Sequence, residues 1–256
     1  MGLTSVALKI AAPLPDIESF ERYLFIGPHP DDIEIGAGAT AAKLAQAGKK
    51  VCFLICADGR FGDGYAPDLC PDELAEVREG EAIASAAALG VEDVRFLRLC
   101  DGGLYEVSEM LEKMAKVIGD FAPDMIFCPD PDVTSECHID HLNTGRCAKQ
   151  LAYLAPYKKI MAQRGCGSAP VKAIGFYMTA KANRFVNTSG LLEKQLDAIF
   201  KNHLSQFPAG CAEAKTIGLY LRLRAYDFGL RRLCRTAEGF RVLGTTQMHC
   251  LPEAGD

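Results

Sequence analysis

The sequence predicts an α/β protein with a mainly parallel sheet between two layers of helices, a Rossmann-like three-layer fold. Short apolar, β-rich runs alternate with amphipathic helical runs through the first two thirds of the chain. The composition is that of a globular protein, with 49% hydrophobic and 24% charged residues among 256. Because no low-complexity linker, charge block or internal repeat divides the chain, we expect one domain over residues 1–256.

The expected elements follow one another in a regular order. Strands are predicted at Tyr23–Gly27, Val51–Cys56, Val94–Leu99 and Met125–Cys128. Helices are predicted at Gly38–Gln46, Asp72–Leu89, Val107–Ile118 and from Asp140 onward. The second helix has the clearest signals, because Pro71 and Asp72 begin it and Gly90 ends it.

After residue 155 the pattern changes. A strand is predicted at Val171–Thr179, and helices at Leu191–His203 and Ala212–Arg232. We expect residues 156–256 to complete the same domain as a strand and helix extension, and residues 1–20 to form an N-terminal extension.

Charge, hydropathy and cysteine usage exclude several classes of protein. Lys and Arg number 28 against 33 Asp and Glu, so the formal charge is −5 and no basic run could neutralise a row of phosphates. We therefore expect no nucleic-acid partner. No stretch reaches the ~18 apolar residues of a membrane span, and no secretory signal is recognisable. The eleven cysteines are scattered along the chain and odd in number, which indicates reduced thiols rather than a disulfide framework. Together with the lack of a recognisable secretory signal or membrane span, this predicts a cytoplasmic protein.

Three of the five histidines lie in two histidine–carboxylate clusters, His29-Pro30-Asp31-Asp32 and His138-Ile139-Asp140-His141. The clusters follow the first and fourth predicted strands. The carboxyl ends of parallel strands meet at one edge of a sheet, so the two loops can converge there. His29, Asp32 and His141 would then supply the three His or carboxylate ligands typical of a hydrolytic zinc site, which leaves one position for water.

The other cluster residues are not needed as metal ligands, so they can act in catalysis. Asp31 remains as a carboxylate beside the metal but not bound to it, as a general base must be. His138, as an imidazolium, could stabilise a developing oxyanion or protonate a leaving amine, with Asp140 orienting it. Ligands without thiolate accept Zn²⁺, Fe²⁺ or Co²⁺, so zinc is the expected metal and iron an alternative.

A competing pattern lies beside the first cluster. Gly36, Gly38 and Ala41 fit the dinucleotide-binding fingerprint, and an acidic residue stands about 20 residues further on. However, Asp31 and Asp32 occupy the helix entrance, where they would repel a pyrophosphate. We expect the glycines to allow close packing of the helix on the sheet instead.

With these motifs the sequence resembles the PIG-L or LmbE-like zinc-dependent N-acetylglucosaminyl deacetylases. Further matching pieces stand in the same order: Arg78 and Glu81, Leu89-Gly90, Asp101-Gly102, Pro123-Asp124, His203-x-Ser205-Gln206 and Ala237-Glu238-x-Phe240. The resemblance implies metal ligands at His29, Asp32 and His141. It also implies a general base at Asp31, a tetrahedral-intermediate histidine at His138 beside Asp140, and sugar contacts at Arg78 and Asp101. His203, Ser205 and Gln206 also match, and for them packing behind the site and contact with the substrate are both open. Arg78 has the alternative of pairing with Glu81 on a helix face.

Departures from the family pattern bear on the substrate. Ile139 stands where the family often has proline, and the loop over residues 58–71 departs from the usual family wording. Phe61, Tyr65 and Tyr105 are the loop aromatics that could pack against a pyranose ring, or that could belong to the core.

Together these observations predict a metal-dependent hydrolase that removes an N-acetyl group from an N-acetylglucosamine-type amino sugar or conjugate. One alternative is a metal-dependent phosphoester hydrolase, for which the ligands of a second ion are too few. The other is a non-catalytic sugar- or metal-binding module, against which the retained Asp31 argues. The expected partner is a small-molecule amino sugar, and a homo-oligomer is compatible with the sequence.

Overall fold

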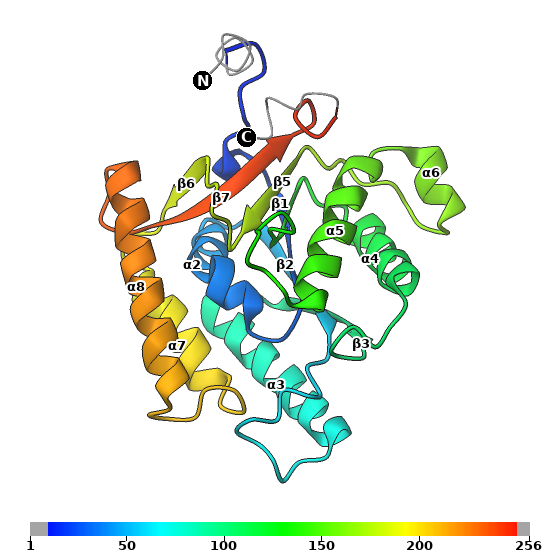
Figure 1. The fold of residues 1–256 in the computed structure, drawn as a ribbon. Helices are drawn as coiled ribbons and strands as arrows, with labels where there is room; N and C mark the ends of the chain where they lie inside the picture. Colours follow the sequence, from blue (N-terminus) through cyan, green and yellow to red (C-terminus); the bar gives the residue numbers. More distant parts are fainter. Residues whose placement is uncertain (1–9, 250–256) are drawn as a thin grey trace.

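The structure, a computed structural model, describes residues 10–249, in which helices cover both faces of a seven-stranded sheet (Figure 1). The strands are β1 (Arg22–Gly27), β2 (Lys50–Ala57), β3 (Asp93–Leu99), β4 (Met125–Pro129), β5 (Ala173–Tyr177), β6 (Arg184–Asn187) and β7 (Ala237–Gly244). Their order is β3-β2-β1-β4-β5-β7-β6. The first five are parallel, and β7 runs antiparallel to β5 and β6. The predicted α/β fold with a mainly parallel sheet is confirmed.

The helices are the 3-10 turn η1 (Ile17–Ser19), α2 (Asp32–Gln46), α3 (Pro71–Leu89), α4 (Val107–Phe121), α5 (Ile139–Leu154), α6 (Lys158–Gln163), α7 (Leu192–Asn202) and α8 (Ala212–Arg232). Within residues 10–249, no helix is long and apolar enough to cross a membrane. The ten cysteines in this part of the chain form no disulfide.

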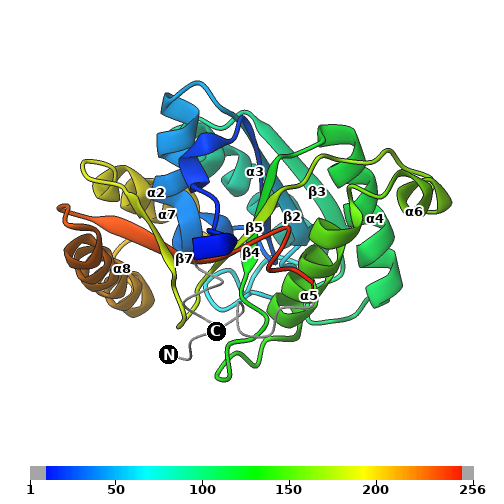
Figure 2. The same cartoon turned by 90° about the horizontal axis from the view of Figure 1, so that it is seen from above.

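Two apolar cores separate the sheet from its helices. Because side chains alternate along a strand, Leu24 and Ile26 of β1 face the core shared with α4, α5 and α6. Tyr23 and Phe25 face the opposite core, shared with α2, α3 and α7. Helix α8 packs outside α7 through a third, smaller core, and it forms one edge of the molecule with α6 at the other (Figures 1 and 2).

The second half of the chain contributes more strands than the sequence predicts. The strands β5, β6 and β7 of residues 156–256 all join the sheet of β1–β4, whereas only β5 is predicted. Strand β7 escapes prediction because Glu238 and Arg241, both buried, interrupt its apolar pattern. Of the predicted N-terminal extension, residues 1–9 lie outside the described part of the chain.

Helix α2 begins at Asp32, six residues before the predicted start. Its first turn is separated from the rest by non-helical backbone at Ala37 (φ −153°, ψ 15°). The predicted close packing on the sheet holds for Gly36, where an added Cβ would lie 2.2 Å from the ring of Tyr177. Gly38 instead faces α7, with Gln195 at 3.1 Å from the position of a Cβ.

Candidate functional site

The two histidine–carboxylate clusters meet where the strand order reverses. The neighbouring strands β1 and β4 are followed by α2 and α5, which cover opposite faces of the sheet. In open α/β sheets the loops after such strands diverge at the carboxyl edge, where ligands bind, and we call this region of the protein the crevice. His29 follows β1 and His141 lies in the first turn of α5, and their ring centroids are 5.5 Å apart. The convergence expected from the sequence is present.

Three side chains in this crevice form a compact set of metal-ligand atoms. One atom each from His29, Asp32 and His141 lies within 4.8 Å of the others. The Oδ2 atom of Asp32 is 3.2 Å from His29 Nδ1 and 3.4 Å from His141 Nε2. Two imidazoles and one carboxylate are the donor set of many hydrolytic zinc sites, so these residues fit a divalent metal ion.

The electrostatics of this set favour an ionised Asp32. Burial alone would raise the pKa of its carboxyl group. The charge of His141, with hydrogen bonds from His141 and His29, outweighs burial and holds the pKa of Asp32 well below its usual range. This balance describes the metal-free site, because a histidine must be neutral to bind a metal, and a bound ion would then supply the positive charge that the histidines supply here.

The far nitrogen of His29 is held by two carboxylates. His29 Nε2 lies 3.0 Å from both Asp101 Oδ1 and Asp140 Oδ2. Asp140 also accepts the backbone N–H groups of Gly102 and Gly103 at 2.8 and 2.9 Å. A carboxylate behind a histidine fixes its ring and its tautomer, here with Nδ1 toward Asp32. Both carboxylates therefore orient His29, and Asp101, only 7% exposed, has its oxygens engaged within the protein.

His138 occupies the N-cap of α5. Its Nδ1 accepts the backbone N–H of Asp140 at 3.3 Å, which leaves Nε2 as the donor nitrogen. Its ring centroid lies 4.7 Å from that of His29 and 5.2 Å from that of His141. The Asp140 carboxylate is 3.8 Å from His138 Nδ1, so it lies closer to His29 than to the histidine it was expected to orient.

The atoms of His29, Asp101, His138 and Asp140 form a second group of ligand atoms within 4.8 Å. This group shares His29 with the first. Two separate ions would require His29 to bind through both ring nitrogens at once, with its remaining proton removed. The geometry therefore favours one ion, with the second group acting as the hydrogen-bonding support of the first.

Asp31 lies in the crevice but outside the set of metal-ligand atoms. It is buried at the N-cap of α2 with a φ of 120°, a backbone conformation that costs a non-glycine residue about 1–3 kcal/mol. Burial, together with the charge of Asp32, raises the pKa of Asp31 to about 6, and Arg78 opposes this shift. A carboxyl group with this pKa is ionised at neutral pH and can still accept a proton readily.

Arg78 braces two loops of the site. Its Nη2 donates to Pro30 O at 2.9 Å and lies 3.4 Å from Asp31 Oδ2, while its Nη1 donates to Gly59 O at 3.0 Å. The loop after β1 is thereby tied to the loop over residues 58–71. Arg78 is buried and does not pair with Glu81 in the way its helical spacing allowed.

The motif His203-x-Ser205-Gln206, whose role the sequence left open, contacts the helices and the loop that surround the site. Ser205 donates through its Oγ to Glu81 Oε2 at 2.6 Å, and Gln206 Nε2 donates to Gly62 O at 2.7 Å. His203 is fully buried, with Nε2 3.3 Å from Glu34 Oε1.

Glu238 stabilises the break in α2. Its carboxylate accepts the backbone N–H groups of Ala39 and Thr40 at 3.1 and 2.7 Å. Both residues lie in the first turn after the non-helical Ala37, and the first amides of a helical segment generally need partners from outside it. Gln195 Nε2 bridges Glu238 to the carbonyl of Glu34 in the first turn of the helix. Glu238 of β7 and Gln195 of α7 therefore fix the position of the turn that carries Asp32.

Glu136 is a site residue that the sequence analysis did not identify. Its Oε2 lies 3.2 Å from His141 Nδ1, and its Oε1 accepts the backbone N–H of His138 at 2.7 Å. Glu136 is thus a carboxylate behind the ring of His141, at ion-pair distance. Unlike the His29–Asp140 contact, this one is not a hydrogen bond, since His141 Nδ1 has no hydrogen-bond partner. The only signal in the sequence was an acidic residue close to the second cluster.

The three loop aromatics have different surroundings. Phe61 is 49% exposed, and its backbone N–H donates to Asp101 Oδ2 at 3.3 Å, which places it beside the cluster. The hydroxyl of Tyr65 donates to Glu213 of α8. Tyr105 packs against the core of α4 and α5. Of these three, Phe61 is an exposed ring whose backbone contacts Asp101 beside the ligand set.

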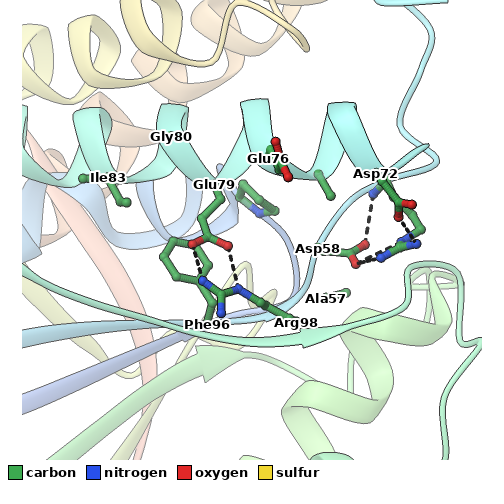
Figure 3. A pocket seen from close by; sticks show the side chains of 12 residues that line it. Ala57, Asp58, Asp72, Glu76, Glu79, Gly80, Ile83, Phe96 and Arg98 are labelled. Atoms are coloured by element: carbon green, nitrogen blue, oxygen red, sulfur yellow. Dashed lines mark hydrogen bonds and ion pairs between the residues drawn. The ribbon is translucent and has the colours of Figure 1, made fainter. Parts of the chain in front are cut away.

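A cavity of about 650 Å³ lies under α3 and not over the ligand set (Figure 3). Pro30 is its only residue from the two clusters. Its two arginines are paired, Arg98 with Glu79, and Arg60 with Asp58 and Asp72. Because these charges are already neutralised and no cluster histidine lines the cavity, we assign the chemistry to the crevice.

Comparisons with known proteins agree with this geometry. Residues 24–152 match the family model PIG-L, described as GlcNAc-PI de-N-acetylase. The diacetylchitobiose deacetylase of Thermococcus kodakarensis is 34% identical over 257 residues, covering 98% of this chain and 93% of the relative. A 1D-myo-inositol 2-acetamido-2-deoxy-alpha-D-glucopyranoside deacetylase of Kineococcus radiotolerans is 41% identical over 127 residues, 47% of this chain and 35% of the relative.

Solved structures give the same result. The N,N'-diacetylchitobiose deacetylase from Pyrococcus horikoshii, in complex with its inhibitor MPG, superposes with a TM-score of 0.86 at 30% identity. The alignment covers 98% of this chain and 97% of that one.

Proposed function

Because the chain belongs to the PIG-L family of de-N-acetylases, which hydrolyse amide bonds, we propose that it removes the N-acetyl group from an N-acetylglucosamine-type sugar or conjugate. The observation that carries the proposal is a complete ligand set, His29, Asp32 and His141, with Asp31 free beside it. The near full-length match to diacetylchitobiose deacetylases makes short N-acetylated chitooligosaccharides the first substrates to test.

His29 Nδ1, Asp32 and His141 Nε2 would hold the metal ion, with zinc as the expected metal and Fe²⁺ as the alternative that the same donors accept. When bound, the ion supplies Lewis-acid polarisation of the amide carbonyl and a water of lowered pKa. Hydrogen bonds to Asp101 and Asp140 orient His29 for this task, and Glu136 lies at ion-pair distance behind His141.

Asp31 acts in this proposal as the general base. Its carboxylate takes a proton from the attacking water, and in the metal-free protein a pKa of about 6 already leaves it ionised at neutral pH. Arg78 keeps the residue in place by holding the adjacent Pro30 carbonyl.

His138 acts at the amide oxygen. Its Nε2–H donates to this oxygen as negative charge develops there. The amine leaves with the proton that Asp31 took from the water. His138 has no further proton to give, because its Nδ1 accepts a backbone N–H and its Nε2–H is donated to the amide oxygen.

The family resemblance marks Arg78 and Asp101 as sugar contacts. Both oxygens of Asp101 and both Nη atoms of Arg78 contact protein groups, whereas Arg78 Nε has no hydrogen-bond partner. In this proposal both residues hold the loops that surround the sugar.

The test is release of primary amine from a panel of N-acetylglucosamine conjugates and chitooligosaccharides, by metal-free and by zinc-reconstituted protein. Zinc-dependent release supports the proposal, and the preferred member of the panel identifies the aglycone. A parallel assay with a chromogenic phosphodiester tests the alternative hydrolase. Zinc binding without turnover on either panel would contradict the proposal and favour a binding module.

A further inference from the structure

The cavity under α3 is a second concave site, which the proposed chemistry leaves unused. Its volume of about 650 Å³ lies within the roughly 300–1,000 Å³ of small-molecule sites. Helix α3 forms one wall, and the end of β2 together with β3 forms the other (Figure 3). One face of α3 lines the cavity over a length of roughly 16 Å, because four of its lining residues recur at intervals of four, three and four. They are Asp72, Glu76, Glu79 and Ile83.

Gly80 indicates that this space is kept open. It lies in the interior of α3, where glycine destabilises a helix relative to alanine. No close approach of another element requires it, because a Cβ at this position meets nothing within 4 Å. Its φ is not among the positive values at which glycine is favoured. Since Gly80 lines the cavity, the role that remains is to leave room there for a bound molecule.

The charged side chains of the walls form pairs that suit hydroxyl groups. Arg98 donates from Nε and Nη2 to Glu79 at 2.9 and 2.6 Å, and its Nη1 has no hydrogen-bond partner in residues 10–249. Arg60 is paired with Asp58 and Asp72. A guanidinium beside a carboxylate offers donors and acceptors close together, which match the adjacent hydroxyls of a sugar. The pairs stay intact when such a ligand binds, because it uses Nη1 of Arg98 and the remaining lone pairs of the carboxylates.

Phe96 supplies an apolar surface next to these polar groups. It stands two residues before Arg98 on β3, and both line the cavity, as expected for side chains on one face of a strand. Ile83 lines the same cavity from α3 and is 48% exposed. The lining therefore suits a ring that is apolar on its faces and polar at its edge, as a pyranose is.

The charge of the lining selects a ligand that carries an amine. Four carboxylates and two arginines line the cavity, so negative charges are in excess by two. Glu76 is the carboxylate that no hydrogen bond or ion pair engages within the described chain (Figure 3). The excess repels phosphates and other anions, and a divalent metal ion would need several free oxygen ligands. A single ammonium group matches the sign of the excess and the one free carboxylate.

We propose that this cavity binds a glucosamine-type amino sugar. Its free ammonium group lies on Glu76, its hydroxyls bond to the Arg98–Glu79 pair, and a ring face packs on the apolar wall. The inference rests on the proposed function, because a free amine on a sugar ring is what removal of an N-acetyl group leaves. Pro30 lines the cavity and the next residue, Asp31, lies in the crevice, so the cavity is a neighbouring site for the product.

The first test measures binding by isothermal titration calorimetry on the zinc-loaded full chain. The probes are the fully deacetylated glucosamine dimer, cellobiose, which has the same ring skeleton without amines, and spermidine, which has amines without a sugar ring. We expect the native protein to bind the glucosamine dimer about tenfold or more tighter than cellobiose, the range of a hydrogen bond to a charged group. Glu76→Gln should abolish this preference. A preference that is absent from the native protein, or unchanged in Glu76→Gln, overturns the amine assignment. Spermidine bound as tightly as the dimer overturns the sugar assignment.

The second test locates the binding with Gly80→Leu, which fills part of the cavity. It should lower the affinity for the glucosamine dimer about tenfold or more. The matched controls are Val77→Leu, an exposed position of α3 outside the cavity, and Glu112→Gln, an exposed carboxylate on α4, and both should bind as the native protein does. Unchanged metal content shows that the variants fold, because α3 contributes no ligand. Native affinity in Gly80→Leu overturns the location.

Amine release from acetylated sugars is measured separately, so failure of this inference can be told from failure of the proposed function. A protein that binds the dimer in the cavity but releases no amine contradicts the proposed function and leaves the cavity site standing. A protein that releases amine, but whose cavity variants bind the dimer as the native protein does, contradicts the cavity site alone.

Discussion

His29 Nε2 lies 3.0 Å from Asp140 Oδ2, although the two residues are 111 positions apart in the chain. This contact joins the loop after β1 to the first turn of α5 across the point where the strand order reverses. It turns Nδ1 of His29 toward Asp32, and it assigns Asp140 to the support of the ligand set. The crevice is therefore organised by side-chain contacts that the protein itself supplies.

Replacement of Asp31 by Asn separates catalysis from metal binding. Asn has nearly the same shape and tolerates positive φ better than most residues, so the N-cap of α2 should keep its conformation. Without a base at this position we expect kcat to fall by about 10²–10⁴-fold, with metal content unchanged. Steady-state amine release and metal analysis measure the two quantities.

His141→Ala is the matched variant, because it removes a ligand and leaves the base. It is expected to lose the metal, since only His29 and Asp32 of the ligand set remain. Near-normal turnover in Asp31→Asn would show that Asp31 is not the general base. Retention of the metal by His141→Ala would show that His141 is not a ligand.

Glu136→Gln tests whether the carboxylate behind His141 tunes the metal site. Loss of such a partner typically costs 10–100-fold in metal affinity, so we expect a fall of about this size. Competition with a chromophoric chelator measures it on the metal-free protein. Glu112→Gln, an exposed carboxylate on α4, is the control and should bind metal as the native protein does. Equal metal affinities of the Glu136→Gln and Glu112→Gln variants would show that Glu136 does not support the metal site.

Gly36→Ala tests the close approach of α2 to the sheet. The added methyl group would meet the buried ring of Tyr177, and overpacking of this kind costs about 1–3 kcal/mol or more of unfolding free energy. Gly80→Ala on α3 is the control, because its Cβ meets nothing within 4 Å. That variant should gain up to about 1 kcal/mol from helix propensity. Urea unfolding measures both, and a neutral Gly36→Ala would contradict the packing.

Glu238→Gln predicts a change in the pH dependence of stability. Burial raises the pKa of Glu238 from its ordinary 4.5 to about 7, against hydrogen bonds from Thr40 and Ala39 that lower it. The folded state therefore holds the proton more tightly than the unfolded state. The contribution of protonated Glu238 to the free energy of unfolding is therefore complete below pH 4.5. It falls by about 3 kcal/mol as the pH rises to 7.

Urea unfolding of metal-free protein at pH 5 and pH 7.5 measures this contribution. The native protein should lose more stability between the two than the Gln variant, which cannot titrate at this position. Asp31 titrates in the same window in both proteins, so the difference between them isolates Glu238. Equal pH dependence would show that Glu238 is ionised throughout.

The sequence predicts those parts of the fold whose signals are local. Pro71 and Gly90 mark α3, and the apolar runs of β1 and β2 mark strands, so these elements form where they are expected. Two elements could not be found from local signals. The buried Glu238 interrupts the apolar pattern of strand β7, and the same residue stabilises the break that separates the first turn of α2 from the rest of the helix. Only the tertiary structure shows its partners, Ala39 and Thr40.

The same distinction applies to the site. The ligand set and Asp31 could be proposed from residue type and from their position after parallel strands. The partners that orient them could not, because Glu136 contacts His141 only through the fold of the loop that precedes α5. The spacing of Arg78 suggested a helix-face pair with Glu81, whereas burial directs it to the carbonyls of Pro30 and Gly59.

The most direct test of the central claim is release of primary amine from N,N'-diacetylchitobiose by the native protein, before and after removal of its metal. We expect release by the metal-loaded protein, loss on chelation, and recovery when one equivalent of zinc is returned. Release that survives complete metal removal, or no release from any N-acetylglucosamine conjugate by protein that holds one zinc, would contradict the account.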